Sequence, residues 1–242
     1  MKKYFLLSFA IVILPSMVSL AQDNPYLGTG RSFVGGGLSV TMSDDENAGN
    51  GFTNRRTSRI NSFGISPTYG KFFNDRWAYG VSFSVGFSNN EQVVFGDSFS
   101  DRSIQKNTTV GLTPFLRRFL PLTERFGAYV QPQLSYAYRD GSSENSFRDT
   151  NSPENDQTRT FDIREHRVSL GMQAGLYYFV TQHFSVETSL LDLNFSYNSS
   201  NRERVDPNAQ PGGNDQLSNT TLQVNLINQI SLDRILILNY YF

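Results

Sequence analysis

The 242-residue sequence contains no cysteine, two histidines and one tryptophan. The absence of cysteine excludes a disulfide framework, thiolate metal sites and a lipid-modified N-terminal cysteine. Two histidines without cysteine also argue against a transition-metal centre. The formal net charge is −1, so the composition gives no indication of nucleic acid or of an acidic substrate. We therefore expect no metal, no cofactor and no nucleic-acid partner.

Long apolar runs are also missing, except at the N-terminus. Residues 1–21 combine two leading lysines, an apolar run over 4–14 and small residues just before Gln22, which is the pattern of a cleaved signal peptide. An N-terminal membrane anchor is the alternative, but the run breaks at Pro15, short of the roughly 20 residues that a spanning helix needs. We predict an exported protein with a signal peptide at 1–21 and one mature domain at 22–242.

The dominant feature of the sequence is the alternation of large apolar residues with small or polar ones. Its 20 Phe and 12 Tyr stand among Gly, Ser and Asn, a mixture that favours strands joined by turns over helices. In "WAYGVSFSVGF" (77–87) the odd positions are large and apolar, and the even positions are small or polar. A period of two places these classes on opposite faces of a strand. Eight segments carry this pattern: 31–42, 61–70, 77–87, 108–118, 126–139, 167–178, 183–197 and 222–242.

Two positions break the alternation. Phe115 falls on the small-residue phase of its segment, which has no explanation at this level. In 183–197 the large-residue phase slips by one position, from Leu190 to Leu191. A single slip of this kind predicts a β-bulge.

The connections between these segments alternate in length. Those at 72–76, 120–124 and 180–183 are tight, whereas those after the first, third, fifth and seventh segments are long and polar. An up-and-down meander gathers its long loops at one end of the strands and its short turns at the other. Transmembrane barrels of the outer membrane show this asymmetry.

A secreted soluble β-barrel or sandwich is the alternative, because its strands also alternate. However, the polar faces here consist of Gly, Ser, Thr, Gln and Asn with few Lys or Glu, which suits a narrow lumen better than a solvated surface. Aromatic residues also collect near strand ends, as interfacial girdles do. We therefore predict an all-β fold, an eight-stranded antiparallel up-and-down transmembrane β-barrel with long extracellular loops and short periplasmic turns. The predicted girdle residues are Tyr69, Phe72, Phe73, Trp77, Phe126, Tyr178, Phe184, Tyr240 and Phe242.

The final stretch "RILILNYYF" places Leu236, Leu238, Tyr240 and Phe242 at every second position. It resembles the C-terminal signature of outer-membrane barrel proteins, although Ile237 stands where that class usually has Gly. The mature chain as a whole resembles the small outer-membrane β-barrel domain family, the relatives of outer-membrane proteins A and X. The resemblance implies a monomer in the outer membrane of a Gram-negative bacterium. It also implies contact with outer-membrane lipid and recognition of the last strand by the barrel-assembly machinery.

The search for catalytic, cofactor-binding or metal-binding residues identifies none. His166 lies near Glu165 and Ser169, the residue types that an outer-membrane lipid A deacylase would use. However, His166 falls on the large-residue phase and Ser169 on the lumen phase, so the two should point apart. His183 is interpreted as a polar turn residue. The acidic run "SDDEN" (43–47) lacks the spacing of a calcium loop and is interpreted as a solvated charged segment.

Five charged residues are predicted to face the lumen: Arg117, Arg139, Arg167, Glu187 and Asp192. Because buried charges are costly unless paired or hydrated, we expect a salt-bridge network, with Glu187 paired to an arginine, rather than an ion path. Glycines at 64, 80, 111, 127, 171 and 175 should make room for the long lumen-facing side chains, which are Tyr129, Gln131, Gln133, Arg167, Gln173, Tyr177 and Glu187.

These features predict a non-enzymatic outer-membrane barrel with a structural or cell-surface interaction role. Two alternatives stay open: an outer-membrane component of a secretion or assembly system, and an outer-membrane lipid-modifying enzyme. A further hypothesis is that the long loops bind an extracellular ligand. An eight-stranded barrel is just wide enough for side chains to fill, so we expect no general porin.

Overall fold

The computed structural model describes residues 26–48, 55–96, 98–149, 151, 152, 154, 156–205, 214–226 and 237–242. The predicted signal peptide lies outside these residues, as do Ile230, Leu232 and Leu236 of the predicted last strand. Among the described residues, no helix is long and apolar enough to cross a membrane.

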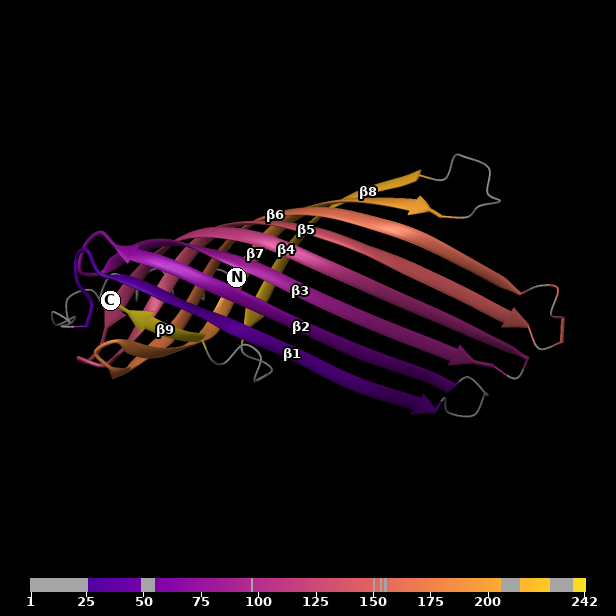
Figure 1. The fold of residues 1–242 in the computed structure, drawn as a ribbon, viewed down its shortest axis with the longest axis horizontal. Helices are drawn as coiled ribbons and strands as arrows, with labels where there is room; N and C mark the ends of the chain where they lie inside the picture. Colours follow the sequence, from indigo (N-terminus) through magenta and orange to yellow (C-terminus); the bar gives the residue numbers. More distant parts are fainter. Residues whose placement is uncertain are drawn as a thin grey trace, which may run out of the picture.

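Nine antiparallel strands build the described part of the chain (Figure 1). They are β1 (Ser32–Ala48), β2 (Arg55–Phe72), β3 (Trp77–Phe95), β4 (Phe99–Pro121), β5 (Phe126–Asp149), β6 (Gln157–Thr181), β7 (Phe184–Arg204), β8 (Asn214–Leu226) and β9 (Ile237–Tyr241).

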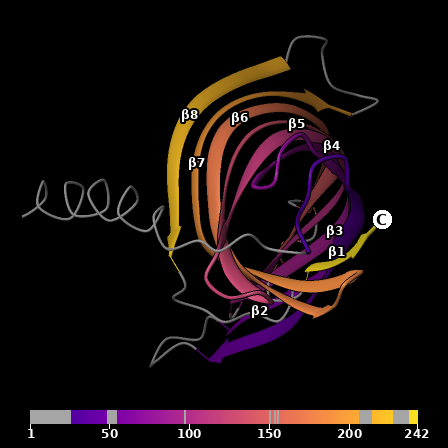
Figure 2. The same cartoon turned by 90° about the vertical axis from the view of Figure 1, so that its left-hand side faces the viewer.

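Strands β1 to β7 pair in sequence order, and β9 closes the ring by pairing with both β7 and β1. Figure 2 shows this ring viewed along the axis of the barrel. The predicted eighth strand is present as two strands: β8 pairs with the half of β7 at Leu191–Glu203, and β9 pairs with Phe184–Glu187. The ring therefore has eight positions, as predicted. Within the described residues, β1 beyond Gly36 pairs only with β2, and β8 pairs only with β7.

The two ends of the ring differ. At one end, which we call the turn end, short turns join β2 to β3, β4 to β5 and β6 to β7, and β9 lies beside them (Figure 1). At the other, the loop end, the strands run far into segments that the sequence analysis counted as loops. For example, β5 and β6 have 24 and 25 residues, whereas a strand crosses a membrane in about 9–11. The predicted long loops are thus in large part strand.

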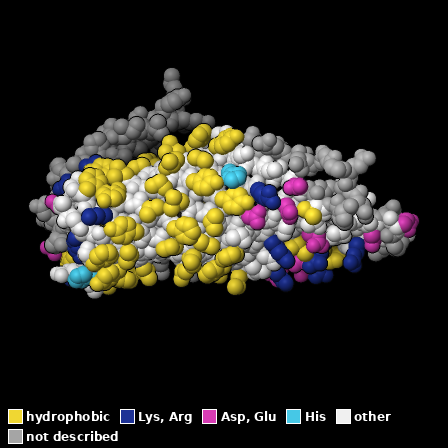
Figure 3. Space-filling model, turned by 45° about the horizontal axis from the view of Figure 1, so that its top comes forward, with side chains coloured by type: hydrophobic (Ala, Val, Ile, Leu, Met, Phe, Trp, Pro, Cys, Tyr) yellow, Lys and Arg dark blue, Asp and Glu magenta, His cyan; other side chains and the backbone are white. Residues whose placement is uncertain are grey.

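The large-residue face points outward, as predicted. Leu38, Leu170 and Leu134 are 67%, 63% and 52% exposed, although burial would normally stabilise such side chains. Figure 3 shows hydrophobic side chains spread over the body of one side, with charged side chains at both ends and the larger group toward the loop end. We call this outward surface the apolar belt. Its members include Val34, Val40, Phe63, Ile65, Tyr79, Val81, Phe83, Phe87, Leu112, Leu116, Tyr136, Val168, Met172, Tyr178, Phe195, Tyr197, Leu238 and Tyr240.

The irregular positions have clear structural reasons. The predicted bulge is confirmed: Ala174 pairs with Leu191 but Gly175 pairs with Ser189, which leaves Leu190 as the extra residue. Phe115 breaks the alternation because its side chain is buried inside the ring. The assignment of Phe72 to an aromatic girdle is wrong, since its side chain is 1% exposed and packs in the interior.

Candidate functional site: a sealed lumen and a loop-end vestibule

A cluster of aromatic side chains fills the lumen at the turn end. Phe72 and Phe119 have ring centroids 5.1 Å apart, and Phe179 and Tyr241 have centroids 5.0 Å apart. Contacts of this kind add to the stabilisation from apolar burial. The cluster therefore occupies the interior rather than lining an opening. Its fully buried members are Phe33, Phe72, Phe119, Tyr129, Tyr177, Phe179 and Tyr241.

Glycines on the same face make room for these rings. A Cβ atom on Gly175 would lie 2.6 Å from Cζ of Tyr129, and one on Gly127 would lie 2.6 Å from Cζ of Tyr177. A Cβ on Gly80 would overlap the ring of Phe115. The predicted pairing of glycines with long lumen-facing side chains is confirmed for Gly127 with Tyr177, for Gly175 with Tyr129 and for Gly171, whose Cβ would lie 3.5 Å from Cγ of Gln133. Phe115, opposite Gly80, was not among the predicted lumen residues. At Gly64 and Gly111 the nearest side-chain atom is instead a serine hydroxyl.

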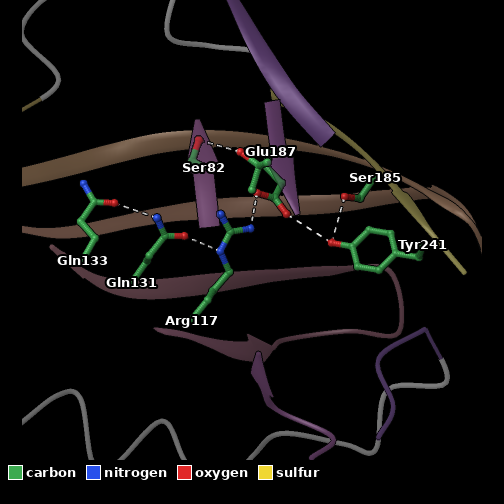
Figure 4. A network of polar contacts seen from close by, with 8 residues as sticks. Ser82, Arg117, Gln131, Gln133, Ser185, Glu187 and Tyr241 are labelled. Carbon is green, nitrogen blue, oxygen red and sulfur yellow. Dashed lines mark hydrogen bonds and ion pairs between the residues drawn. The ribbon is translucent and has the colours of Figure 1, made fainter. Parts of the chain in front are cut away.

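Directly beside the aromatic cluster, a buried ion pair crosses the lumen from β4 to β7. Nη1 of Arg117 donates to Oε2 of Glu187 at 2.7 Å, and the two side chains are 4% and 0% exposed. Nε of Arg117 donates to Gln131 at 2.7 Å, and Gln131 donates to Gln133 at 2.8 Å (Figure 4). The hydroxyl of Tyr241 donates to Glu187 at 3.3 Å. The predicted pairing of Glu187 with an arginine is confirmed, and the partner is Arg117.

The ion pair and the aromatic cluster form one unit, which we call the plug. The guanidinium carbon of Arg117 lies 4.5 Å from the ring centroid of Tyr129 and 5.6 Å from that of Phe33. Cation–π contacts of this kind favour the charged group in a poorly hydrated site. Because Glu187 neutralises the charge, the plug contains no net charge that would demand water.

The segment before β1 folds across the turn end below the plug. The ring of Tyr26 stacks on Phe179 at 5.2 Å, and Leu27 is 4% exposed. Arg31 donates to the carbonyl oxygens of Tyr26 and Gln182 at 2.7 and 2.9 Å. The pKa of Arg125 in the adjacent turn is raised, chiefly by its hydrogen bond to Tyr26. These contacts hold the segment against the plug.

The other predicted lumen charges lie above the plug, toward the loop end. Glu165 accepts from both Arg139 and Arg167 at 3.0 Å, and Arg167 also donates to Asn198 at 2.6 Å. Asp192 is paired in register with Gln173 on the inward phase beyond the bulge. Four of the five predicted lumen charges therefore form ion pairs, in two separate groups: Arg117 with Glu187, and Arg139 and Arg167 with Glu165.

The residues considered for catalysis do not come together. His166 is exposed on the outer face, where Nδ1 lies 2.9 Å from the hydroxyl of Tyr136, while Ser169 is buried on the inner face. His183 lies in a turn and stacks on Tyr240. In the acidic run, Asp44 and Glu46 form ion pairs with Arg59 and Arg55 across the β1–β2 ladder. The described residues contain no group of three or more side chains that could hold a metal ion.

At the loop end the inner face of the sheet forms a cavity of about 440 Å³, which we call the vestibule. Four strands, β4 to β7, contribute to it. All of its lining residues continue the inward phase that carries the plug further down each strand. They are Asp101, Asn145, Phe147, Gln157, Arg159, Phe161 and Arg202.

The sequence did not predict the vestibule, because its residues lie in segments whose polar composition is typical of loops. The alternation of faces along each strand could have located it. Phe147 lies an even number of positions from the lumen-facing Tyr129 in β5, and Phe161 lies an even number of positions from the lumen-facing Tyr177 in β6. Register then brings the residues together, since Asp101 pairs with Phe147, which pairs with Gln157.

The comparison with protein families agrees with this architecture. Residues 5–227 match the family described as outer membrane protein beta-barrel domain. Among solved structures, the chain is similar to the outer membrane protein OprG from Pseudomonas aeruginosa, with 14% sequence identity and a TM-score of 0.44 over 89% of this chain and 97% of that chain. No curated protein matches the sequence.

Proposed function

The chain belongs to the outer membrane protein beta-barrel domain family, and we propose that in the outer membrane it acts as a monomeric, non-enzymatic surface-binding barrel. In this role the apolar belt holds the protein in the lipid, the plug closes the lumen, and the loop end presents the vestibule to the outside. The role rests on export through the predicted signal peptide at 1–21 and on insertion of the last strand by the barrel-assembly machinery.

The plug is the observation that carries this proposal. A diffusion channel needs a water-filled path, and such barrels use about sixteen or more strands. Here Arg117 and Glu187 are joined across an eight-position ring, and aromatic rings fill the space beside them. Opening a path would separate a buried ion pair, which leaves both charges uncompensated and costs several kcal/mol, on the order of 3–5.

The positions of the candidate catalytic groups also favour binding over catalysis. A hydrolase built on His166 and Ser169 would need them within hydrogen-bonding reach of each other. They lie on opposite faces of β6, and His166 is engaged with Tyr136. The other histidine, His183, stacks on Tyr240 in the turn before β7.

The proposal is tested by liposome swelling. Proteoliposomes containing the refolded barrel are diluted into isotonic solutions of small neutral sugars, with a known general porin as the positive control. We expect swelling no faster than that of protein-free liposomes, because the plug blocks the lumen. Rapid swelling that scales with the amount of folded barrel would contradict the proposed role.

A further inference from the structure

We propose that the vestibule binds an acidic sugar, meaning a monosaccharide or short oligosaccharide that carries a carboxylate or phosphate group. This inference names a ligand class for the surface-binding role proposed above and rests on it. Its volume of about 440 Å³ falls within the range of small-molecule sites, roughly 300–1,000 Å³.

The first argument is an imbalance of charge. At the loop end, three outward-facing arginines have carboxylate partners on the neighbouring strand: Arg59 with Asp44, Arg102 with Glu91 and Arg55 with Glu46. The two arginines of the vestibule do not. Arg159 donates to the neutral amide of Gln157 at 2.8 Å, and Arg202 makes no ion pair with any described residue.

The second argument is the state of Arg202. Its guanidinium carbon lies 3.7 Å from the ring centroid of Phe161, so the ring fixes the position of the planar group. Its Nε is buried and has no hydrogen-bond partner among the described residues. A buried donor without a partner is costly, and a bound carboxylate or phosphate oxygen would satisfy it with a charge-assisted hydrogen bond.

The third argument is the mixture of the remaining groups. Asp101 and Gln157 supply acceptors, and Asn145 already accepts from Ser103 at 2.8 Å, which leaves its amide N–H groups directed elsewhere. Phe147 and Phe161 supply apolar faces. An acidic sugar matches these lining residues, because it offers hydroxyl groups, apolar C–H faces and one negative charge. A simple inorganic anion would leave Asp101 and the two phenylalanine rings without a role.

The test is isothermal titration calorimetry on the mature barrel refolded in detergent micelles. Three probes are titrated separately: trigalacturonate, glucose 6-phosphate and the neutral maltotriose. Arg202→Gln is compared with Arg164→Gln, which makes the same change on the outward face of the neighbouring strand β6, where Arg164 is 58% exposed. Folding of each variant is checked by the mobility of unheated and boiled samples on a detergent gel.

We expect an acidic probe to bind, Arg202→Gln to weaken it about tenfold or more, and Arg164→Gln to leave it within about twofold of the parent. Binding of trigalacturonate assigns a carboxylate, and binding of glucose 6-phosphate assigns a phosphate. Arg159→Gln, a second variant, should also weaken binding. The proposal is overturned if neither acidic probe binds, if maltotriose binds as tightly, or if Arg164→Gln weakens binding as much as Arg202→Gln. Because swelling of proteoliposomes depends on the plug and not on the vestibule, the two proposals can fail independently.

Discussion

The turn-end and loop-end halves of the barrel each contain an arginine–glutamate ion pair, but the two pairs lie in different environments. At the turn end, Arg117 and Glu187 lie 2.7 Å apart with side chains 4% and 0% exposed. At the loop end, Arg102 and Glu91 are also 2.7 Å apart, but their side chains are 52% and 28% exposed. The distance is equal, so the surroundings decide what each pair does. The buried pair closes the lumen, and the exposed pair joins strands that water can solvate anyway.

The largest expected effect comes from the terminal aromatic, which lies in the turn-end half. The backbone N–H and carbonyl of Phe242 both bond to Ser32 at 2.9 Å across the closing seam, and its side chain is 58% exposed. We expect Phe242→Lys to abolish most of the folded barrel in membranes, because it replaces the aromatic residue of the predicted assembly signal. The charge itself should add only about 0–1 kcal/mol at the lipid interface. Heat-modifiable protein in outer-membrane fractions is measured by gel mobility.

The matched change at the loop end is Phe95→Lys, on a side chain that is 45% exposed beyond the apolar belt. It should leave the folded band nearly intact. If Phe95→Lys were the variant lost from the membrane, the assignment of the two ends would be reversed.

The second prediction removes one charge from the buried pair. Glu187→Gln keeps the shape of the side chain but leaves Arg117 charged in a site where it is 3% exposed. We expect a loss of about 3–5 kcal/mol in the free energy of unfolding. Urea unfolding of the barrel in lipid vesicles measures it, and a loss below about 1 kcal/mol would show that the plug is hydrated.

The third prediction concerns the apolar belt. Leu170 is 63% exposed on the outer face of β6, so Leu170→Lys brings a charge into lipid at a cost of about 2–4 kcal/mol near the bilayer midplane. Thr158→Lys introduces the same charge on the exposed, outward face of β6 near its loop end and should change the unfolding free energy little. Equal effects in vesicles would argue that the belt does not face lipid.

The smallest effect is expected for Glu91→Gln, the loop-end counterpart of Glu187→Gln. Water solvates Arg102 when its partner is neutral, so the loss should be less than about 1 kcal/mol. The same urea titration provides the comparison. A loss as large as that of Glu187→Gln would remove the distinction between the two halves.

The sequence predicted the turn-end half well because lipid and lumen are different solvents for the two faces. The alternation of segment 167–178, the bulge at Leu190 and the pairing of Glu187 all follow from that contrast. Phe115 and Phe72 lie on the small-residue, lumen-facing phase of their strands, but a large apolar residue fits both a lipid face and an aromatic plug, so residue type and phase gave opposite indications. In the structure both side chains are buried, and Gly80 makes room for the ring of Phe115.

The loop-end half was predicted poorly for a related reason. Beyond the apolar belt both faces of a strand meet water, so the period of two weakens and a polar strand looks like a loop. For this reason the sequence does not indicate that β5 continues to Asp149 or that β6 begins as early as Gln157. The vestibule depends on the register between these strands, and the sequence alone does not give that register.

The most direct test of the sealed lumen is a current recording from single barrels in planar bilayers. Wild-type protein is reconstituted at low density and held at moderate voltage of either sign, with insertion verified by the mobility of protein recovered from matched vesicles. We predict no sustained current above the baseline of the empty bilayer, because the plug spans the ring between β4 and β7. Stable, nanosiemens-scale openings from a monomer would contradict the account.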